Sequence, residues 1–263
     1  MAKEKNNTTK ITTQAALDRV VWSICDILRR DKAKGARLYV PELTWMLFLN
    51  ALDQKEAEEE ARARALGAPF TPSIEPPYRW RDWAVPPDNP LPLFQRDGFQ
   101  PGWKRRELTE APLGAFLDFV NNCLFPYLRD LGHRPGATYR QRVIGMIFAH
   151  KERTILESET NLLDAIDRVD ALSRAEISDQ HIFLLSQAFE GLLPRLGEKA
   201  NDGGQFFTPR EIIRVIVRTV NPQLGGTVYD PCCGTGGFLI EAYKHMAAQS
   251  PTPTQIEQLK TET

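Results

Sequence analysis

Three closely spaced glycines follow an apolar run and an Asp-Pro pair, and this segment of the chain is the one best suited to chemistry. Thr227, Val228 and Tyr229 are β-branched or aromatic, so they predict a short buried strand that ends at the Asp-Pro pair. Glycine tolerates positive φ and lets backbone amides approach a ligand closely. The candidate binding residues of this turn are Asp230, Pro231, Gly234, Thr235, Gly236, Gly237 and Phe238.

A helix with one apolar face is predicted directly after the turn, formed by Phe238, Leu239, Ile240, Ala242, Tyr243 and Met246. Strand, glycine turn and helix form the opening unit of a doubly wound α/β domain, in which ligands bind at the carboxyl ends of the strands. The order Gly-Thr-Gly-Gly lacks the spacing of a dinucleotide fingerprint, and no Gly-Lys-Ser/Thr follows it as in a phosphate-binding loop. A dinucleotide enzyme is therefore poorly supported.

The chemistry of the turn favours a ligand with an amino-acid end. The carboxylate of Asp230 repels phosphate but accepts hydrogen bonds from an ammonium group, while glycine amides suit a carboxylate. This pairing fits the methionine part of S-adenosylmethionine. The alternative is a tight glycine turn that binds no ligand.

A second loop precedes the first by about one helix length. Thr208-Pro209-Arg210-Glu211 matches a capping box with proline at the first helical position. The helix that follows is predicted to bury Ile212, Ile213, Val215, Ile216 and Val220. A helix start does not explain Gln205, Phe206 and Phe207, whose two aromatic rings could stack on a purine or anchor the core.

The two loops together resemble a known family. Gly-Gly-Gln-Phe-Phe-Thr-Pro-Arg followed by Asp-Pro-Cys-Cys-Gly-Thr-Gly-Gly-Phe is similar to the modification subunit of type I restriction-modification systems, an adenine-specific DNA methyltransferase that uses S-adenosylmethionine. The resemblance extends upstream through residues 21–29, 43–53, 162–170 and 181–193. It implies that both loops line the cofactor pocket, from Gln205 to Arg210 and from Asp230 to Phe238.

The chain departs from the family pattern in one respect. The family's catalytic signature, Asn-Pro-Pro followed by an aromatic residue, occurs nowhere in the sequence, and the acidic residue that binds the ribose is also missing. We therefore assign no catalytic residue, and we expect an N-terminal portion of such a subunit that is inactive on its own. When complete, the family's reaction transfers a methyl group to the 6-amino group of adenine in DNA.

The resemblance also implies an assembly. The expected partners are a specificity subunit, a restriction subunit, a second modification subunit and DNA. A different class of function remains open, in which the chain is a non-catalytic helical interaction module that binds the specificity subunit.

Composition limits the kinds of binding site and the cellular compartment that we expect. The formal net charge is −1 over 263 residues, so no global positive field indicates nucleic-acid binding, although local basic patches survive a neutral total. Four cysteines without Cys-x-x-Cys spacing and four scattered histidines predict neither a metal site nor a disulfide framework. Cys25 and Cys123 are expected in the core. With no signal peptide and no long apolar run, we expect a cytoplasmic protein without membrane segments.

The fold class that we predict is mainly α: an N-terminal helical bundle followed by the beginning of an α/β S-adenosylmethionine-dependent methyltransferase domain. The bundle is assigned to residues 1–175 and the truncated methyltransferase domain to residues 176–263. Helices are expected at residues 12–30, from Pro41 onward, and at residues 113–131, 139–150 and 161–173. The charged run from residue 53 to 64 is interpreted as a solvated helix extension.

Residues 67–112 differ from the rest of the bundle because they are rich in proline and aromatic residues. Proline disfavours regular structure, so a long ordered loop over the bundle is expected. Trp80 and Trp83 are the exposed partner-binding surface in one interpretation, and pack onto the bundle in the other.

Overall fold

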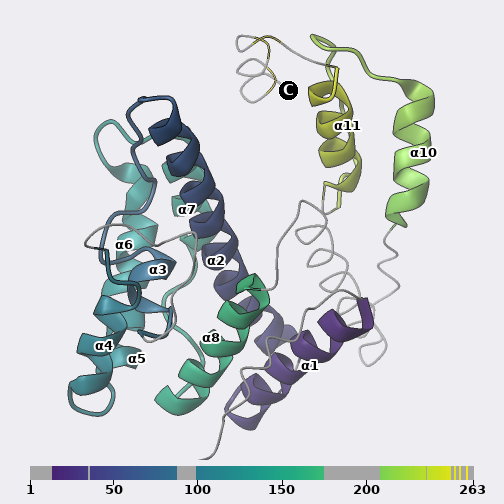
Figure 1. Ribbon diagram of the computed structural model, residues 1–263. Coiled ribbons are helices and arrows are strands. Elements are labelled where there is room, and N and C mark those ends of the chain that lie inside the picture. The colour runs from purple at the N-terminus through teal and green to yellow at the C-terminus, as the bar shows by residue number, and fades with distance from the viewer. Residues whose placement is uncertain are drawn as a thin grey trace, which may run out of the picture. The chain divides into compact units, whose positions relative to one another are not determined.

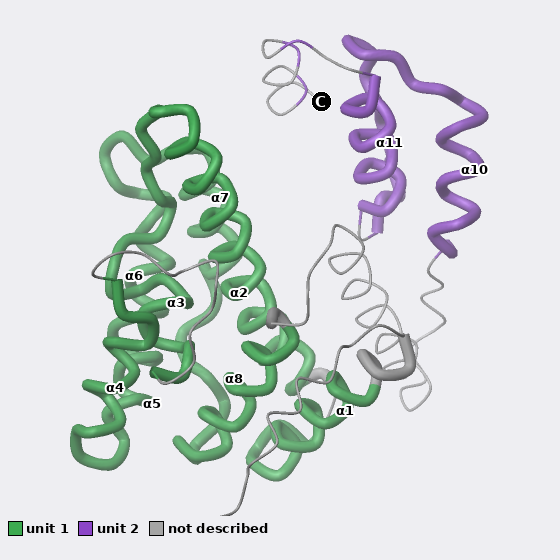
Figure 2. The backbone as a smooth tube through the Cα atoms, viewed as in Figure 1, with its two compact units in different colours: residues 1–192 green, residues 193–263 purple. Residues whose placement is uncertain are grey.

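The computed structural model describes residues 14–34, 36–87, 99–174, 208–234 and 236–249, together with 252, 255 and 259. The chain divides into two compact units, Met1–Leu192 and Leu193–Thr263 (Figures 1 and 2). The described residues are mainly helical and include no β-strand, in agreement with the predicted fold class. The predicted domain boundary near residue 175 lies outside the described residues.

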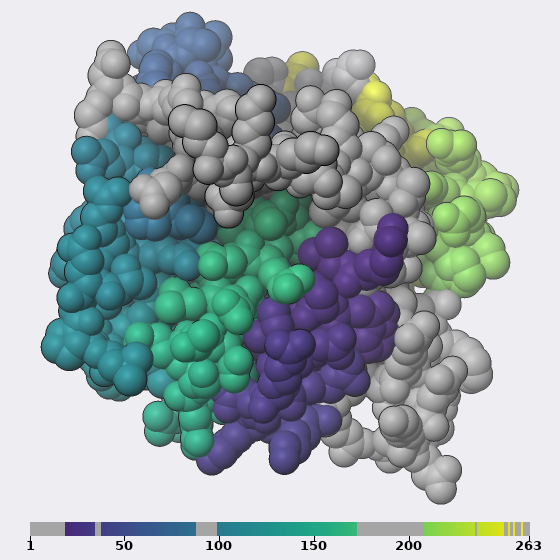
Figure 3. Space-filling model, turned by 60° about the horizontal axis from the view of Figure 1, so that its bottom comes forward, coloured from purple at the N-terminus to yellow at the C-terminus, as the bar shows by residue number. Residues whose placement is uncertain are grey.

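Three helices form one side of unit 1. α1 (Gln14–Arg30) and α8 (Glu159–Arg174) lie along each other, and both contact α2 (Ala36–Ala65). The apolar stripe of α1 is spaced at helical intervals, so that Val21, Ile24 and Leu28 are buried as predicted. The space-filling view shows α8 beside α1 on one face of this unit (Figure 3).

The opposite side of unit 1 is a run of shorter helices. They are α3 (Trp80–Trp83), α4 (Trp103–Glu110), α5 (Ala115–Asp118), η2 (Phe119–Leu124), α6 (Phe125–Asp130), η3 (Leu131–His133) and α7 (Tyr139–Phe148). The helix predicted over residues 113–131 is thus continuous from α5 to α6, but its middle, η2, is a π-helix. A π-turn shifts the inward face, and Cys123 is exposed rather than in the core. Cys25 is buried, as expected.

The core of unit 1 is aromatic. Trp45 stacks on Trp83 at 6.4 Å between centroids and meets Phe125 edge-on at 5.2 Å. Trp80 and Trp83 are both buried, so they pack onto the bundle and do not form an exposed surface. Regular structure is also more extensive than the prolines of residues 67–112 suggested, because α3 and α4 lie within this segment.

Charged residues of α2 tie this segment to the bundle. Asp53 is 4 % exposed, and its carboxylate accepts hydrogen bonds from the Nε atom of Arg81 at 2.8 Å and from the backbone amide of Arg81 at 3.1 Å. Burial raises the pKa of the Asp53 carboxyl to about 6, although the Arg81 guanidinium opposes this rise. The prediction that the charged run of α2 is solvated is therefore wrong at Asp53 and at Glu56, which is also buried. Pro41 lies inside α2, which begins earlier than expected.

Unit 2 contains two packed helices, α10 (Arg210–Val220) and α11 (Gly237–Ala247). Their shared core consists of Ile213 and Val217 from α10 and Ala242 from α11, with Val228 and Phe238 packed against it. Both helices start at the same end, since the first turn of α10 meets Glu241 and its C-terminal cap Asn221 meets His245 at 2.8 Å.

The strand predicted at residues 227–229 is not formed. The segment is neither helix nor strand, and Tyr229 is 84 % exposed. A β-strand needs neighbouring strands to pair its backbone groups, and the described residues supply none. Among the described helices, none is long and apolar enough to cross a membrane.

Candidate functional site

The glycine turn forms as the sequence predicts. Gly234 has φ 51° and Gly236 has φ 76°, a left-handed conformation that glycine adopts without steric penalty. The Gly236 amide donates to the Cys233 carbonyl at 2.7 Å, and Gly236 is the N-terminal cap of α11. Among the described residues, no heavy atom lies within 4 Å of where a Cβ would stand at either glycine, so these residues leave open space beside the backbone of the turn.

Asp230 orders the start of the turn. Its Oδ1 atom accepts a hydrogen bond from the Cys232 amide at 3.0 Å, and the residue is half-buried. Pro231, Cys232, Cys233 and Gly234 are exposed around it. The carboxylate therefore lies at an accessible loop whose far end is the N-terminus of α11, where unpaired amides and the helix dipole favour an anionic group.

The first turn of α11 is held against α10 by contacts between small and apolar residues. A Cβ at Gly237 would lie 2.9 Å from the Cδ1 atom of Ile213, so only glycine allows this approach without a shift of the isoleucine. Phe238 packs against the core of the two helices, which makes packing its visible role.

The first loop differs from the prediction at its cap. α10 begins at Arg210, its cap is Pro209 with ψ 137°, and no side chain caps it. Thr208 is exposed, and the expected capping box with Glu211 does not form. The register is one residue later than predicted because the proline lies before the helix rather than in its first turn. Gln205, Phe206, Phe207 and Thr235 lie outside the described residues.

Arg210, at the end of the first predicted loop, contacts the helix that follows the second loop. Its side chain is 9 % exposed, and its Nη1 atom lies 3.8 Å from the Oε1 atom of Glu241 on α11. The structure thus brings the start of α10 next to the first turns of α11, as a shared site requires. Its visible contact is an ion pair that fastens the helices together.

Glu241 is the residue of this region that the sequence reasoning missed. It is 8 % exposed, and it also pairs with Arg214 at 3.4 Å and Lys244 at 3.4 Å. A single acidic residue within the apolar helix Gly237–Ala247 was the available signal, because a buried carboxylate requires cationic partners.

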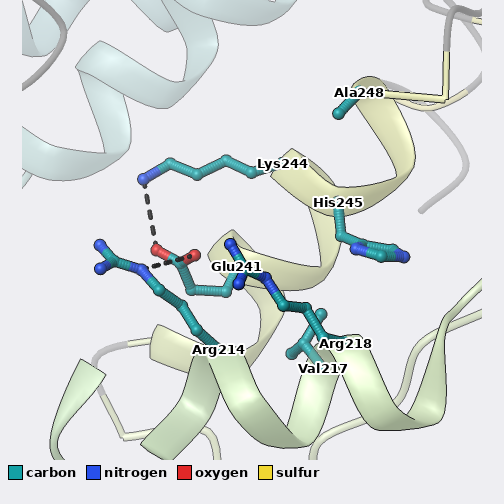
Figure 4. A pocket seen from close by; sticks show the side chains of 7 residues that line it. All are labelled: Arg214, Val217, Arg218, Glu241, Lys244, His245 and Ala248. Atoms are coloured by element: carbon teal, nitrogen blue, oxygen red, sulfur yellow. Dashed lines mark hydrogen bonds and ion pairs between the residues drawn. The ribbon is translucent and has the colours of Figure 1, made fainter. Parts of the chain in front are cut away.

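A cavity of about 230 Å³ lies beside this ion-pair network, between α10 and α11. Figure 4 shows Arg214 and Arg218 from α10 and Lys244 from α11 around Glu241, with His245 on the neighbouring side. No group of histidine, cysteine and acidic residues suited to a metal ion occurs among the described residues. Cys232 and Cys233 are free thiols.

Comparison with known sequences gives two matches along the chain. The family described as HsdM N-terminal domain matches residues 17–169, and the family described as N-6 DNA Methylase matches residues 180–261. The methylase subunit of the type I restriction enzyme EcoEI from Escherichia coli is 29 % identical over 233 residues, which are 88 % of this chain and 41 % of that protein.

Two solved structures from type I restriction-modification systems are also similar to this chain. A modification subunit of a putative type I restriction enzyme from Vibrio vulnificus YJ016 is 34 % identical, with a TM-score of 0.72 over 94 % of this chain and 49 % of that one. A chain from a structural study of complex assembly and conformational transition in a type I R-M system is 36 % identical, with a TM-score of 0.60 over 94 % of this chain and 44 % of that one. The chain therefore spans less than half the length of each of these relatives.

Proposed function

Because the chain belongs to the family of methylase (modification) subunits of type I restriction enzymes, we propose that it forms the bundle and the cofactor-binding start of an adenine-specific DNA methyltransferase. The observation that carries the proposal is the pair of matches over residues 17–169 and 180–261. The complete enzyme transfers a methyl group from S-adenosylmethionine to the 6-amino group of adenine, which is reached by extruding the base from the duplex.

The residues of the turn fit the amino-acid end of the cofactor. Asp230 would accept hydrogen bonds from the ammonium group, while the amides of Gly237 and Phe238 would donate to the carboxylate at the start of α11. The open space beside Gly234 and Gly236 supports this proposal, because a ligand can approach the backbone there. The cofactor supplies the electrophilic methyl group, and these residues bind and orient its methionine part.

The residues of the first loop have a different proposed role in cofactor binding. By the family resemblance, Gln205, Phe206, Phe207, Thr208 and Pro209 line the cofactor pocket, where the two aromatic rings stack on the purine or anchor the core, and Thr235 belongs to the turn at the amino-acid end. Arg210 acts through Glu241, since its ion pair holds the start of α10 beside α11 and so fixes the spacing of the two loops.

We assign residues 1–175 to the helical domain and residues 176–263 to the start of the methyltransferase domain. The 263-residue chain carries no Asn-Pro-Pro-aromatic segment, so we expect it to transfer no methyl group by itself. The direct test measures labelled methyl transfer from S-adenosylmethionine to unmethylated DNA with the specificity subunit present. Turnover above background would contradict the assignment of catalysis to the Asn-Pro-Pro segment.

A specificity subunit, a restriction subunit, a second modification subunit and DNA are the proposed partners. A second function, a helical module that binds the specificity subunit, is favoured by one observation. α7 presents Tyr139, Met146 and Ile147 to solvent, with exposed fractions of 71 %, 74 % and 50 %, although Ile144, Gly145 and Phe148 of the same helix are buried.

The two functions are separable by experiment. Limited proteolysis that yields a stable fragment ending near residues 175–196, still able to capture the specificity subunit, supports the interaction module. Loss of capture on removal of residues 197–263 assigns the contact to the methyltransferase portion instead.

A further inference from the structure

A polar pocket lies in unit 1, between the helical run of η2 and α6 and the segment that follows α7. It is open to solvent and has a volume of about 480 Å³. We name it the Asn121 pocket, and its lining residues are Asn121, Asn122, Pro126, Arg129, Ala149 and Glu152. The lining has one cationic and one anionic side chain, so its net charge is zero.

Two hydrogen bonds join the walls of the Asn121 pocket. The Oδ1 atom of Asn121 accepts from the Thr154 amide at 2.8 Å, and the Nη1 atom of Arg129 donates to the Lys151 carbonyl at 3.1 Å. The Thr154 hydroxyl also donates to the buried carboxylate of Glu42, on α2, at 2.7 Å. The walls are therefore fixed to the bundle, and a ligand that enters does not have to order them.

Asn121 has a hydrogen-bond donor that the fold does not use. The residue is 8 % exposed, and it lies in η2 beside the buried Val120 and Leu124. Its oxygen is bound by the Thr154 amide, but no acceptor for its Nδ2 group occurs among the residues that the structure describes. A buried amide without a partner is costly, and most such groups bind protein, water or a ligand. Because Asn121 lines the pocket, a ligand there can supply the acceptor.

The backbone around Asn121 is also unusual. Residues Phe119–Leu124 form a π-helix between the α-helices α5 and α6. π-helical turns are rare in proteins and occur frequently at functional sites. The π-helical geometry and the unused amide group thus coincide at the same residue.

The other unused groups of the pocket define the class of ligand. Arg129 is half-buried, and its Nε and Nη2 atoms have no acceptor in the described parts of the chain, so they add donors to that of Asn121. Glu152 is exposed, and within the same parts no cation pairs with it. The neutral lining disfavours a phosphate group, and none of the six lining residues is an aromatic on which a nucleobase could stack. A peptide main chain presents both a carbonyl acceptor and an N–H donor, which match this lining.

We propose that the Asn121 pocket binds an extended peptide segment of a partner protein. The Nδ2 group of Asn121 and the Arg129 guanidinium donate to a main-chain carbonyl, and Glu152 pairs with a lysine or arginine side chain of the same segment. The segment is extended because the carbonyls of a helix are already bonded within the helix. This site lies in unit 1, so it rests neither on methyl transfer nor on cofactor binding at the glycine turn.

The first experiment uses a small blocked amino acid, N-acetyl-lysine N-methylamide, which has two peptide groups and one ammonium group. It is titrated into the 263-residue chain, and the side-chain amide signal of Asn121 and the backbone amide signal of Thr154 are followed by NMR. Saturable shifts of both signals are expected. The absence of a saturable shift at Asn121 would overturn the proposal, because its Nδ2 group would then serve only to bind water.

The variant Asn121→Asp tests the direction of the hydrogen bond. Aspartate has the shape of asparagine and keeps an oxygen for the Thr154 amide, but it replaces the donor by an acceptor. The affinity for the blocked lysine is expected to fall about five- to tenfold, the effect of one hydrogen bond. An unchanged affinity would show that the probe binds elsewhere and would overturn the proposal.

The variant Glu152→Gln carries no risk of unfolding from a lost contact, since Glu152 is exposed and makes no ion pair within the described residues. It should weaken binding of the blocked lysine about two- to fivefold, the effect of an exposed ion pair, and leave binding of the blocked norleucine analogue unchanged. The matched control is Glu110→Gln, which removes the same charge from an exposed residue of α4 outside the pocket. Equal weakening in this control, or equal weakening for both probes, would overturn the proposal, because the effect would then not require Glu152 to pair with the ligand.

Discussion

Replacement of Glu241 by alanine tests whether the ion-pair network positions the two loops. Glu241 is the carboxylate shared by Arg210 and Arg214 on α10 and by Lys244 on α11. Its removal leaves Arg210, whose side chain is 9 % exposed, without this carboxylate. The two helices then lose the polar contact that joins their first turns, while the apolar contacts of Ile213 and Val217 remain.

The three ion pairs of Glu241 do not contribute equally to the stability that the Glu241→Ala variant is expected to lose. Breaking a buried pair from one side typically costs about 3–5 kcal/mol. The Nη1 atom of Arg210 lies at the longer distance of 3.8 Å from the Glu241 carboxylate, and Arg210 has a further interaction. A smaller destabilisation is therefore expected from breaking this pair. Arg214 and Lys244 are 35 % and 55 % exposed, and screened pairs of this kind contribute under about 1 kcal/mol each. We expect Glu241→Ala to destabilise the α10–α11 pair by roughly 2 kcal/mol.

Amide hydrogen exchange is the suitable assay because it reports stability locally. A loss of roughly 2 kcal/mol corresponds to about thirtyfold faster exchange in α10 and α11. Exchange in α1, α2 and α8 of unit 1 should not change. Glu211→Ala is the matched control, since Glu211 is an exposed carboxylate of α10 outside the network. Equal exchange rates in the two variants would refute the assignment of Glu241 as the link between the helices.

Three further predictions concern single residues. In a polypeptide that joins this sequence to the rest of the methyltransferase domain, Asp230→Ala should weaken S-adenosylmethionine binding by roughly 1.5–3 kcal/mol, the strength of a hydrogen bond to a charged group, and unchanged affinity by calorimetry would leave the turn a purely structural element. Gly102→Ala should lower the free energy of unfolding by about 2–4 kcal/mol, because φ is 68° and a Cβ would stand 2.2 Å from the Val85 carbonyl oxygen. The control Gly67→Ala shares the left-handed φ but meets no atom within 4 Å, so it should cost only about 1–2 kcal/mol, and equal losses in chemical denaturation would rule out the clash. Because burial raises the pKa of Asp53 to about 6 from 3.8, the folded state holds its proton more tightly, and this group's stabilising contribution is lost as pH rises through that interval. The stability difference between wild type and Asp53→Asn should therefore shift by about 2 kcal/mol between pH 4 and 6, whereas parallel stability curves would contradict the raised pKa.

Helices with a regular apolar stripe were predictable from sequence. α1, α7 and α8 lie where residues 12–30, 139–150 and 161–173 predicted helices, and α11 follows the glycine turn as expected. Periodicity reports which residues must leave water, and this information is local. The positive φ of Gly234 and Gly236 was predictable for the same reason, since glycine is the residue that adopts it freely.

Partners of charged residues were not predictable in the same way. The run that contains Asp53 has the composition of a solvated helix, yet Asp53 is buried against Arg81, which lies 28 residues further along the chain. Arg210 was expected at the cofactor, and its visible partner is Glu241. In both cases the sequence contains each charge, but the pairing depends on a tertiary contact that no local pattern encodes.

The apolar residues of unit 2 show a related limit of pattern-based prediction. Ile213 and Val217 are buried against α11, but Ile212, Val215 and Val220 remain 51 %, 64 % and 71 % exposed on the same helix. The run Thr227–Tyr229 has the composition of a buried strand, and such strands lie in parallel sheets with neighbours that pair their backbone. Three residues cannot provide that layer alone. The exposed face of α10 and the unformed strand are therefore two signals of one missing layer, and a pattern of apolar residues indicates that burial is required without specifying the surface that supplies it.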